Sequence, residues 1–96
     1  MSAYIIARIN VTDPEQYSKY TQLTPAAIEK FGGKFIVRAG EMVTLEGEEE
    51  QNRIVVVEFP DLETAKKFYA SEDYQAAKAV RIDAAVGQFI AIAGTD

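Results

Sequence analysis

The stretch Phe31-Gly-Gly-Lys-Phe-Ile-Val-Arg-Ala-Gly40 combines the signatures of a helix end, a turn and a short strand. Two adjacent glycines can adopt positive φ angles freely, so they suit the end of a helix and a tight reversal. Side chains alternate along a strand, which would put Phe35, Val37 and Ala39 on one face and Lys34, Ile36 and Arg38 on the other. The first face is apolar and the second carries an arginine, so the fold depends on what covers each face.

The segment before this stretch predicts a strand and then a helix. Residues 3–11 alternate as a strand with one dry face and one mixed face. Asp13 is a good N-cap and Pro14 suits the first helical position, so we expect a helix from there to Phe31. Pro25 should bend this helix or divide it into two segments.

The segment after this stretch predicts two more strands and two more helices. Residues 42–45 could extend the 34–39 strand as a bulged continuation, and residues 46–52 are acidic and typical of a solvated loop. The β-branched run in 53–59 predicts a strand covered on both faces. Asp61 and Ser71 are the expected N-caps of two helices, and residues 86–93 form the predicted last strand.

The resulting order, β-α-β-β-α-α-β, predicts an α+β, ferredoxin-like fold for a single domain over residues 1–96. Such a fold has a four-stranded antiparallel sheet with its helices on one face. No segment is left to cover the other face, so a second copy of the sheet is the simplest cover and we expect a homodimer.

Strand alternation also predicts which residues face away from the helices. That face would be too apolar to be exposed to solvent and too charged to lie in a hydrophobic core. Such a composition is typical of the wall of a cleft between two sheets. Its predicted members are Tyr4, Ile6, Arg8, Ile36, Arg38, Ile54, Val56, Glu58, Gln88, Ile90 and Ile92.

Composition excludes several classes of function. The net charge of −5 argues against nucleic acid as a partner, because binding to phosphates needs clustered Lys and Arg. The chain has no Cys and no His, and its carboxylates show no metal-ligand spacing, so we expect neither a metal nor haem, and no cofactor. No apolar run approaches the about 20 residues of a membrane span, and the start has no signal-peptide pattern, so we expect a cytoplasmic protein without a membrane partner.

The chain carries a series of short motifs, which are Tyr17-x-x-Tyr20, Phe31-Gly-Gly33, Arg38-Ala-Gly40, Leu45-Glu-Gly47, Glu58-Phe59, Ala65, Phe68-Tyr69, Ser71-x-x-Tyr74-Gln75 and Arg81. In this order and spacing, they resemble the DUF1330 family over nearly the whole chain. The resemblance implies the dimeric α+β barrel superfamily, which includes antibiotic-biosynthesis monooxygenases and muconolactone isomerases that share a fold rather than a chemistry.

Arg38, Arg81 and Glu58 are the best candidates for chemistry. A guanidinium offers a planar fork for a carboxylate or an enolate oxygen, so Arg38 and Arg81 are predicted to bind substrate, with Arg38 also catalytic. Glu58 could be a general base if desolvation raised its pKa. The competing interpretation is a structural ion pair of Glu58 with Arg38 or Arg8 that closes the dimer cleft.

Three tyrosines complete the predicted site. Tyr20, Tyr69 and Tyr74 lie on helix faces that should pack against the sheet, where each could bury its ring and still offer a hydroxyl to a ligand, although plain core packing is the alternative. The leading functional hypothesis is a cofactor-independent enzyme or binding protein for a small anionic or enolisable molecule. The alternative is a non-catalytic dimeric module whose cleft residues serve only assembly.

Overall fold

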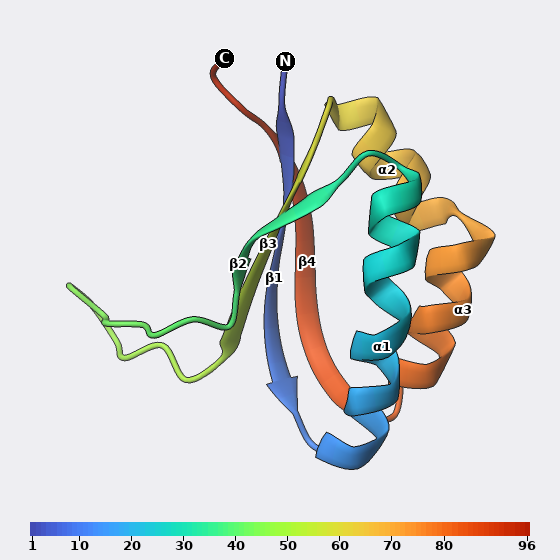
Figure 1. Cartoon of the computed structure of the whole chain (residues 1–96). Coiled ribbons are helices and arrows are strands. Elements are labelled where there is room, and N and C mark those ends of the chain that lie inside the picture. Colours follow the sequence, from blue (N-terminus) through green and yellow to red (C-terminus); the bar gives the residue numbers. More distant parts are fainter.

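The computed structural model describes all residues, 1–96, and Figure 1 shows them as one sheet with its helices on one side. The predicted order of elements is confirmed. It runs β1 (Ala3–Val11), α1 (Pro14–Lys30), β2 (Lys34–Arg38), β3 (Arg53–Phe59), α2 (Leu62–Ala70), α3 (Glu72–Arg81) and β4 (Ala85–Ala93).

The sheet is four-stranded with the order β2-β3-β1-β4, and all three neighbouring pairs are antiparallel. The three helices cover one face, which we call the inner face, and leave the other, the outer face, without a layer (Figure 1). The ferredoxin-like α+β fold is therefore confirmed. No helix of the structure is long and apolar enough to cross a membrane.

Three side-chain caps set where the helices begin, as predicted. Asp13 accepts a hydrogen bond from the backbone N–H of Gln16 at 3.2 Å, and Asp61 accepts one from Thr64 at 2.7 Å. Ser71 accepts from the N–H of Tyr74 at 3.1 Å. Each cap satisfies one of the N–H groups that a helix start leaves without an intrahelical partner.

Pro25 does not divide the first helix, because α1 continues through it from Pro14 to Lys30. A proline has no N–H, so the carbonyl oxygen of Thr21, four residues earlier, receives no helical hydrogen bond. That oxygen is available to a donor from outside the helix.

The alternation predicted for residues 34–39 is wrong beyond Phe35, because the β2–β3 ladder has a bulge. Phe35 pairs with Val57, but Val37 then pairs with Val56, and Arg38 with Val55. The extra residue, Ile36, shifts the side chains that follow by one position. Val37 therefore lies on the outer face, and Arg38 lies on the inner face.

The predicted continuation of β2 over residues 42–45 is also absent. β2 ends at Arg38, Ala39 adopts a positive φ of 54°, and the chain leaves the sheet as an irregular loop until Arg53. This loop, residues 39–52, projects from the body on the side opposite the helices (Figure 1).

The core fills the space between the inner face and the helices. Alternate residues of β1, Ile5, Ala7 and Ile9, are buried there, and Phe59 is the most completely buried large side chain. Aromatic rings from all three helices meet over this face. The ring centroid of Phe68, on α2, lies 5.0 Å from those of Phe59 and of Tyr74, on α3, and the Tyr74 centroid lies 6.2 Å from that of Tyr20, on α1. One part of this layer is not filled, and it forms the candidate site.

Candidate functional site

A cavity lies between the inner face of the sheet and the helices. Its volume is about 50 Å³, and 13 of its 17 lining residues are hydrophobic. A water molecule needs roughly 10–15 Å³ by this kind of measure, so the space suits a few waters or a short organic molecule. This cavity lies within one chain, under α1, whereas the sequence predicted a site on the outer face.

The charged groups that line this cavity are all positive. Arg38 and Arg53 line it, and none of the lining residues is Asp or Glu. The chain as a whole has 15 acidic and 10 basic residues. The charged residues of the cavity wall, which are all basic, therefore differ from the acidic composition of the whole chain. An arginine cannot accept a hydrogen bond and stays charged, so the charged part of this lining offers only positive charge and hydrogen-bond donors.

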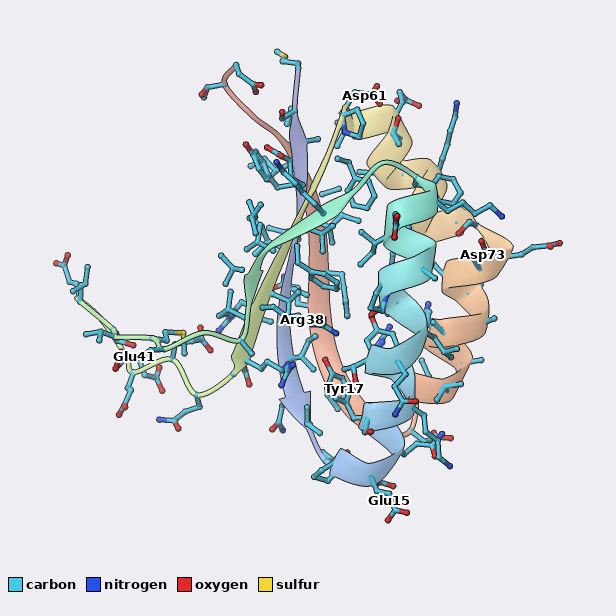
Figure 2. The ribbon with its side chains drawn as sticks, viewed as in Figure 1. Glu15, Tyr17, Arg38, Glu41, Asp61 and Asp73 are labelled. Carbon is cyan, nitrogen blue, oxygen red and sulfur yellow. The ribbon has the colours of Figure 1, made fainter.

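Arg38 lies at the rim of the cavity, at the end of β2. Its Nη2 donates to the carbonyl oxygen of Thr21 at 3.2 Å, and its guanidinium carbon lies 4.3 Å from the centre of the Phe35 ring. Figure 2 shows Arg38 between the sheet and α1, with Tyr17 nearby. The bulge at Ile36 and the proline at position 25 together produce this placement, because one turns the side chain inward and the other frees its acceptor.

Arg53 is a second cavity arginine that sequence reasoning missed. It was interpreted only as the first residue of a strand, yet its guanidinium carbon lies 5.4 Å from the Tyr17 ring centre. Its Nε is buried and has no hydrogen-bond partner. Arg53 pairs directly opposite Ile9, an inner-face residue of β1, and this pairing places its side chain on the inner face. The sequence alone does not reveal the pairing, because it does not give the strand register.

Arg81, at the end of α3, is buried behind the cavity wall. Only 5% of it is exposed, and its guanidinium carbon lies 4.6 Å from the Phe89 ring centre and 5.5 Å from that of Tyr20. Its Nε has no hydrogen-bond partner, and Arg81 takes part in no salt bridge. Burying a cation without a paired anion costs free energy of folding. Arg81 also adds positive potential to a region that has no negative charge to balance it.

Two of the predicted tyrosines form a buried pair in the same cavity. The hydroxyl oxygens of Tyr20, on α1, and Tyr74, on α3, are 2.9 Å apart, and both rings line the space. Burial raises the pKa of Tyr20, and the neighbouring Tyr74 raises it further, so this phenol remains protonated. Tyr69 also lines the cavity, with its ring centre 5.0 Å from that of Tyr74.

Glu58 lies on the outer face, away from the arginines of the cavity. Its carboxylate is 3.3 Å from Lys34 Nζ and accepts a 3.4 Å hydrogen bond from the Tyr4 hydroxyl. The expected ion pair of Glu58 with Arg38 is therefore absent, because the bulge puts the two on opposite faces. Within the chain, Arg8 pairs with Glu50 at 2.6 Å rather than with Glu58. The residues Arg38 and Glu58 are not brought together within the chain.

The comparisons with known proteins agree with the architecture. The structure defines a ferredoxin-like α+β protein whose cavity lies between sheet and helices. The chain belongs to the DUF1330 family, described as a domain of unknown function, whose model matches residues 2–95. No similar sequence was found among proteins with curated annotation.

Several solved structures share the fold at low sequence identity. A protein of unknown function from Rhodopseudomonas palustris has a TM-score of 0.77 at 17% identity, with 99% of this chain and 83% of that chain covered. The cofactor-independent oxygenase SnoaB from Streptomyces nogalater has a TM-score of 0.70 at 10% identity, with 99% and 94% covered. A dimeric ferredoxin-like protein of unknown function from Thermobifida fusca has a TM-score of 0.59 at 17% identity, with 98% and 92% covered.

Proposed function

We propose that this protein binds a small organic anion, foremost a short carboxylate, in the cavity between the sheet and the helices. The observation that carries the proposal is the set of three arginines in and behind the cavity with no carboxylate among the lining residues. The Nε atoms of Arg53 and Arg81 are buried and lack partners. A carboxylate in the cavity would supply an acceptor for Arg53 and the missing negative charge at once.

Each arginine has a distinct part in this proposal. Arg38 and Arg53, which line the cavity, contact the carboxylate directly, and Arg38 is held at the rim by Thr21. Arg81 lies behind Tyr20 and Phe89 and stabilises the bound anion through space, since a charge acts over several ångströms in a poorly hydrated site. Glu58, engaged with Lys34 on the outer face, has no part in binding within this cavity.

The apolar remainder of the wall limits the body of the ligand. Side chains such as Ile9, Val55 and Phe35 leave a space of about 50 Å³, which accepts a short chain rather than a polycyclic molecule. The likeness to a cofactor-independent oxygenase supports a fold able to act on small molecules, and the proposed class is an enzyme or binding protein that needs no cofactor.

We also propose that two copies associate through the outer faces of their sheets. Large apolar side chains are exposed there, on β2 and β4, and a patch of this size is unusual on a monomer. They are Ile36, Val37, Val86, Ile90 and Ile92. The 39–52 loop adds Val43 and Leu45, which are 73% and 93% exposed. The dimeric ferredoxin-like neighbour supports association in pairs.

The experiment that tests the binding proposal compares ligands that differ only in charge. Propionate and propionamide have nearly the same shape, and a cavity with arginines and no acid should bind the anion alone. Isothermal titration calorimetry and thermal shift should show saturable binding and stabilisation with propionate and neither with propionamide. Equal effects of the two, or none from a panel of short carboxylates, would instead favour a non-catalytic dimeric module.

A further inference from the structure

The hydroxyl pair of Tyr20 and Tyr74 has a spare hydrogen-bond donor. Two phenols carry two O–H hydrogens, and the single 2.9 Å contact between them uses one. Neither hydroxyl has another hydrogen-bond partner in the protein, so the second hydrogen has no acceptor there. Both tyrosines are buried and line the cavity, so the free donor is accessible to a bound molecule rather than to bulk water.

The backbone holds this pair in place from two helices. The N–H of Tyr74 is fixed by the hydroxyl of Ser71 at the start of α3, and Tyr20 lies in the middle of α1. The Tyr20 ring packs edge-on against the Tyr74 ring, with centroids 6.2 Å apart. The pair is therefore a fixed feature of the wall, and a ligand oxygen must come to it.

The two arginines of the wall are donors as well. Arg38 and Arg53 cannot accept a hydrogen bond, and the Thr21 hydroxyl uses its own hydrogen on the backbone oxygen of Ser18 at 2.9 Å. Neither Thr21 nor Thr24, the other threonine of the wall, is hydrogen-bonded to the tyrosine pair. A carboxylate bound by the arginines leaves the tyrosine donor unsatisfied unless the ligand carries another acceptor. The donor set therefore matches an anion with acceptor oxygens at two places.

We infer that the ligand is a short oxo acid, with its carboxylate on the arginines and its ketone oxygen on the tyrosine pair. This inference rests on the proposed anion site and names the ligand class for it. A ketone oxygen is a pure acceptor, so it takes the free O–H without introducing a hydrogen that needs an acceptor of its own. A small chain is required, because the cavity holds about 50 Å³.

The test uses pyruvate and propionate, which have equal carbon chains and differ by the ketone oxygen. One hydrogen bond between neutral groups contributes about fivefold in affinity, so the wild type should bind pyruvate about fivefold more tightly than propionate. The double variant Tyr20→Phe/Tyr74→Phe should bind both equally, with propionate affinity unchanged. Removing both hydroxyls together leaves no orphaned group, so the variant should fold.

A matched control removes a phenol hydroxyl elsewhere. Tyr4 lies on the outer face, outside the cavity, so Tyr4→Phe should retain the preference for pyruvate. A measurement on the wild type does not depend on any variant: the infrared C=O stretch of the ketone of bound, 13C-labelled pyruvate should shift to lower wavenumber than in water-free solvent.

The outcomes separate this inference from the proposal beneath it. Equal binding of pyruvate and propionate by the wild type, or a preference that persists in the double variant, overturns the oxo-acid assignment and leaves the anion site standing. An unshifted C=O stretch of the bound ketone also overturns the oxo-acid assignment and leaves the anion site standing. Failure of both carboxylates to bind overturns the anion site and the oxo-acid assignment together.

Discussion

Arg38 Nη2 donates a hydrogen bond to the carbonyl oxygen of Thr21 at 3.2 Å, and this contact joins the end of β2 to α1 at the rim of the cavity. The carbonyl is available because Pro25, four residues later, has no N–H with which to close the helical turn. A residue that breaks one helical hydrogen bond thus provides the anchor of a proposed ligand-binding arginine.

Replacing this proline should separate stability from binding. Pro25→Ala supplies the missing N–H, which then competes with Arg38 for the Thr21 oxygen. We expect the free energy of unfolding to rise by about 1–3 kcal/mol, since proline is unfavourable inside a helix, while affinity for propionate falls several-fold. Denaturant melts and calorimetry measure the two effects. A more stable variant with unchanged affinity would show that the Thr21 contact does not position Arg38.

The turn before β2 should be sensitive to a single methyl group. A Cβ at Gly33 would lie 2.6 Å from the Phe59 ring and 2.9 Å from an Ile28 methyl group. A side chain at Gly33 is therefore excluded by lack of space and not by backbone conformation. The positive φ angle of this turn, 73°, belongs to Gly32. Gly33→Ala should lower the free energy of unfolding by about 1–3 kcal/mol through overpacking.

Gly40 provides the control for that measurement. No atom lies within 4 Å of a Cβ built there, and its φ is not in the positive region. Gly40→Ala should therefore leave the denaturation midpoint within error of the wild type. Equal stability of both variants would contradict the packing described for the turn.

The projecting loop offers a test of assembly that leaves the fold intact. Val43 and Leu45 are exposed in the single chain, so Val43→Ser/Leu45→Ser should not change the secondary structure. If these side chains bury against a second copy, the dimer should dissociate at a higher protein concentration than in the wild type. Light scattering over a dilution series measures this, with 10.6 kDa as the mass of one chain. A wild type that is monomeric at micromolar concentration would contradict the dimer.

Binding should not depend on pH near neutrality. Arginine stays protonated, and burial raises the pKa of Tyr20 above its usual range, so the donors keep their protons from pH 6 to 9. Affinity for propionate, which is ionised throughout, should be constant over this range by calorimetry. A titration midpoint between pH 6 and 9 in the plot of affinity against pH would reveal a titrating group in the site. Above about pH 10 stability should fall, because the unfolded Tyr20 ionises while the folded one resists.

Sequence periodicity and capping residues predicted the elements, their order and the sheet topology. Asp13, Asp61 and Ser71 mark the helix starts by local chemistry, which a sequence displays directly. The ferredoxin-like order then follows from chain connectivity, so the fold needed no information about contacts between distant residues.

The residues that line the cavity could not be predicted in the same way. Arg38 and Glu58 were expected on one face, and a one-residue bulge at Ile36 separates them. A bulge depends on how two strands pair, and the β2 sequence alternates equally well without it. Arg53 shows the same limit, because its inward position depends on its pairing opposite Ile9.

The most direct test of the central claim is the dissociation constant of propionate measured by calorimetry for three variants beside the wild type. Arg53→Met and Arg38→Lys each remove a guanidinium fork from the cavity, and we expect at least about tenfold weaker binding for each. Lys19→Gln makes the same change in charge as Arg53→Met at an exposed position of α1 and should bind as the wild type does. Equal affinity across all four proteins would contradict an anion site built on Arg38 and Arg53.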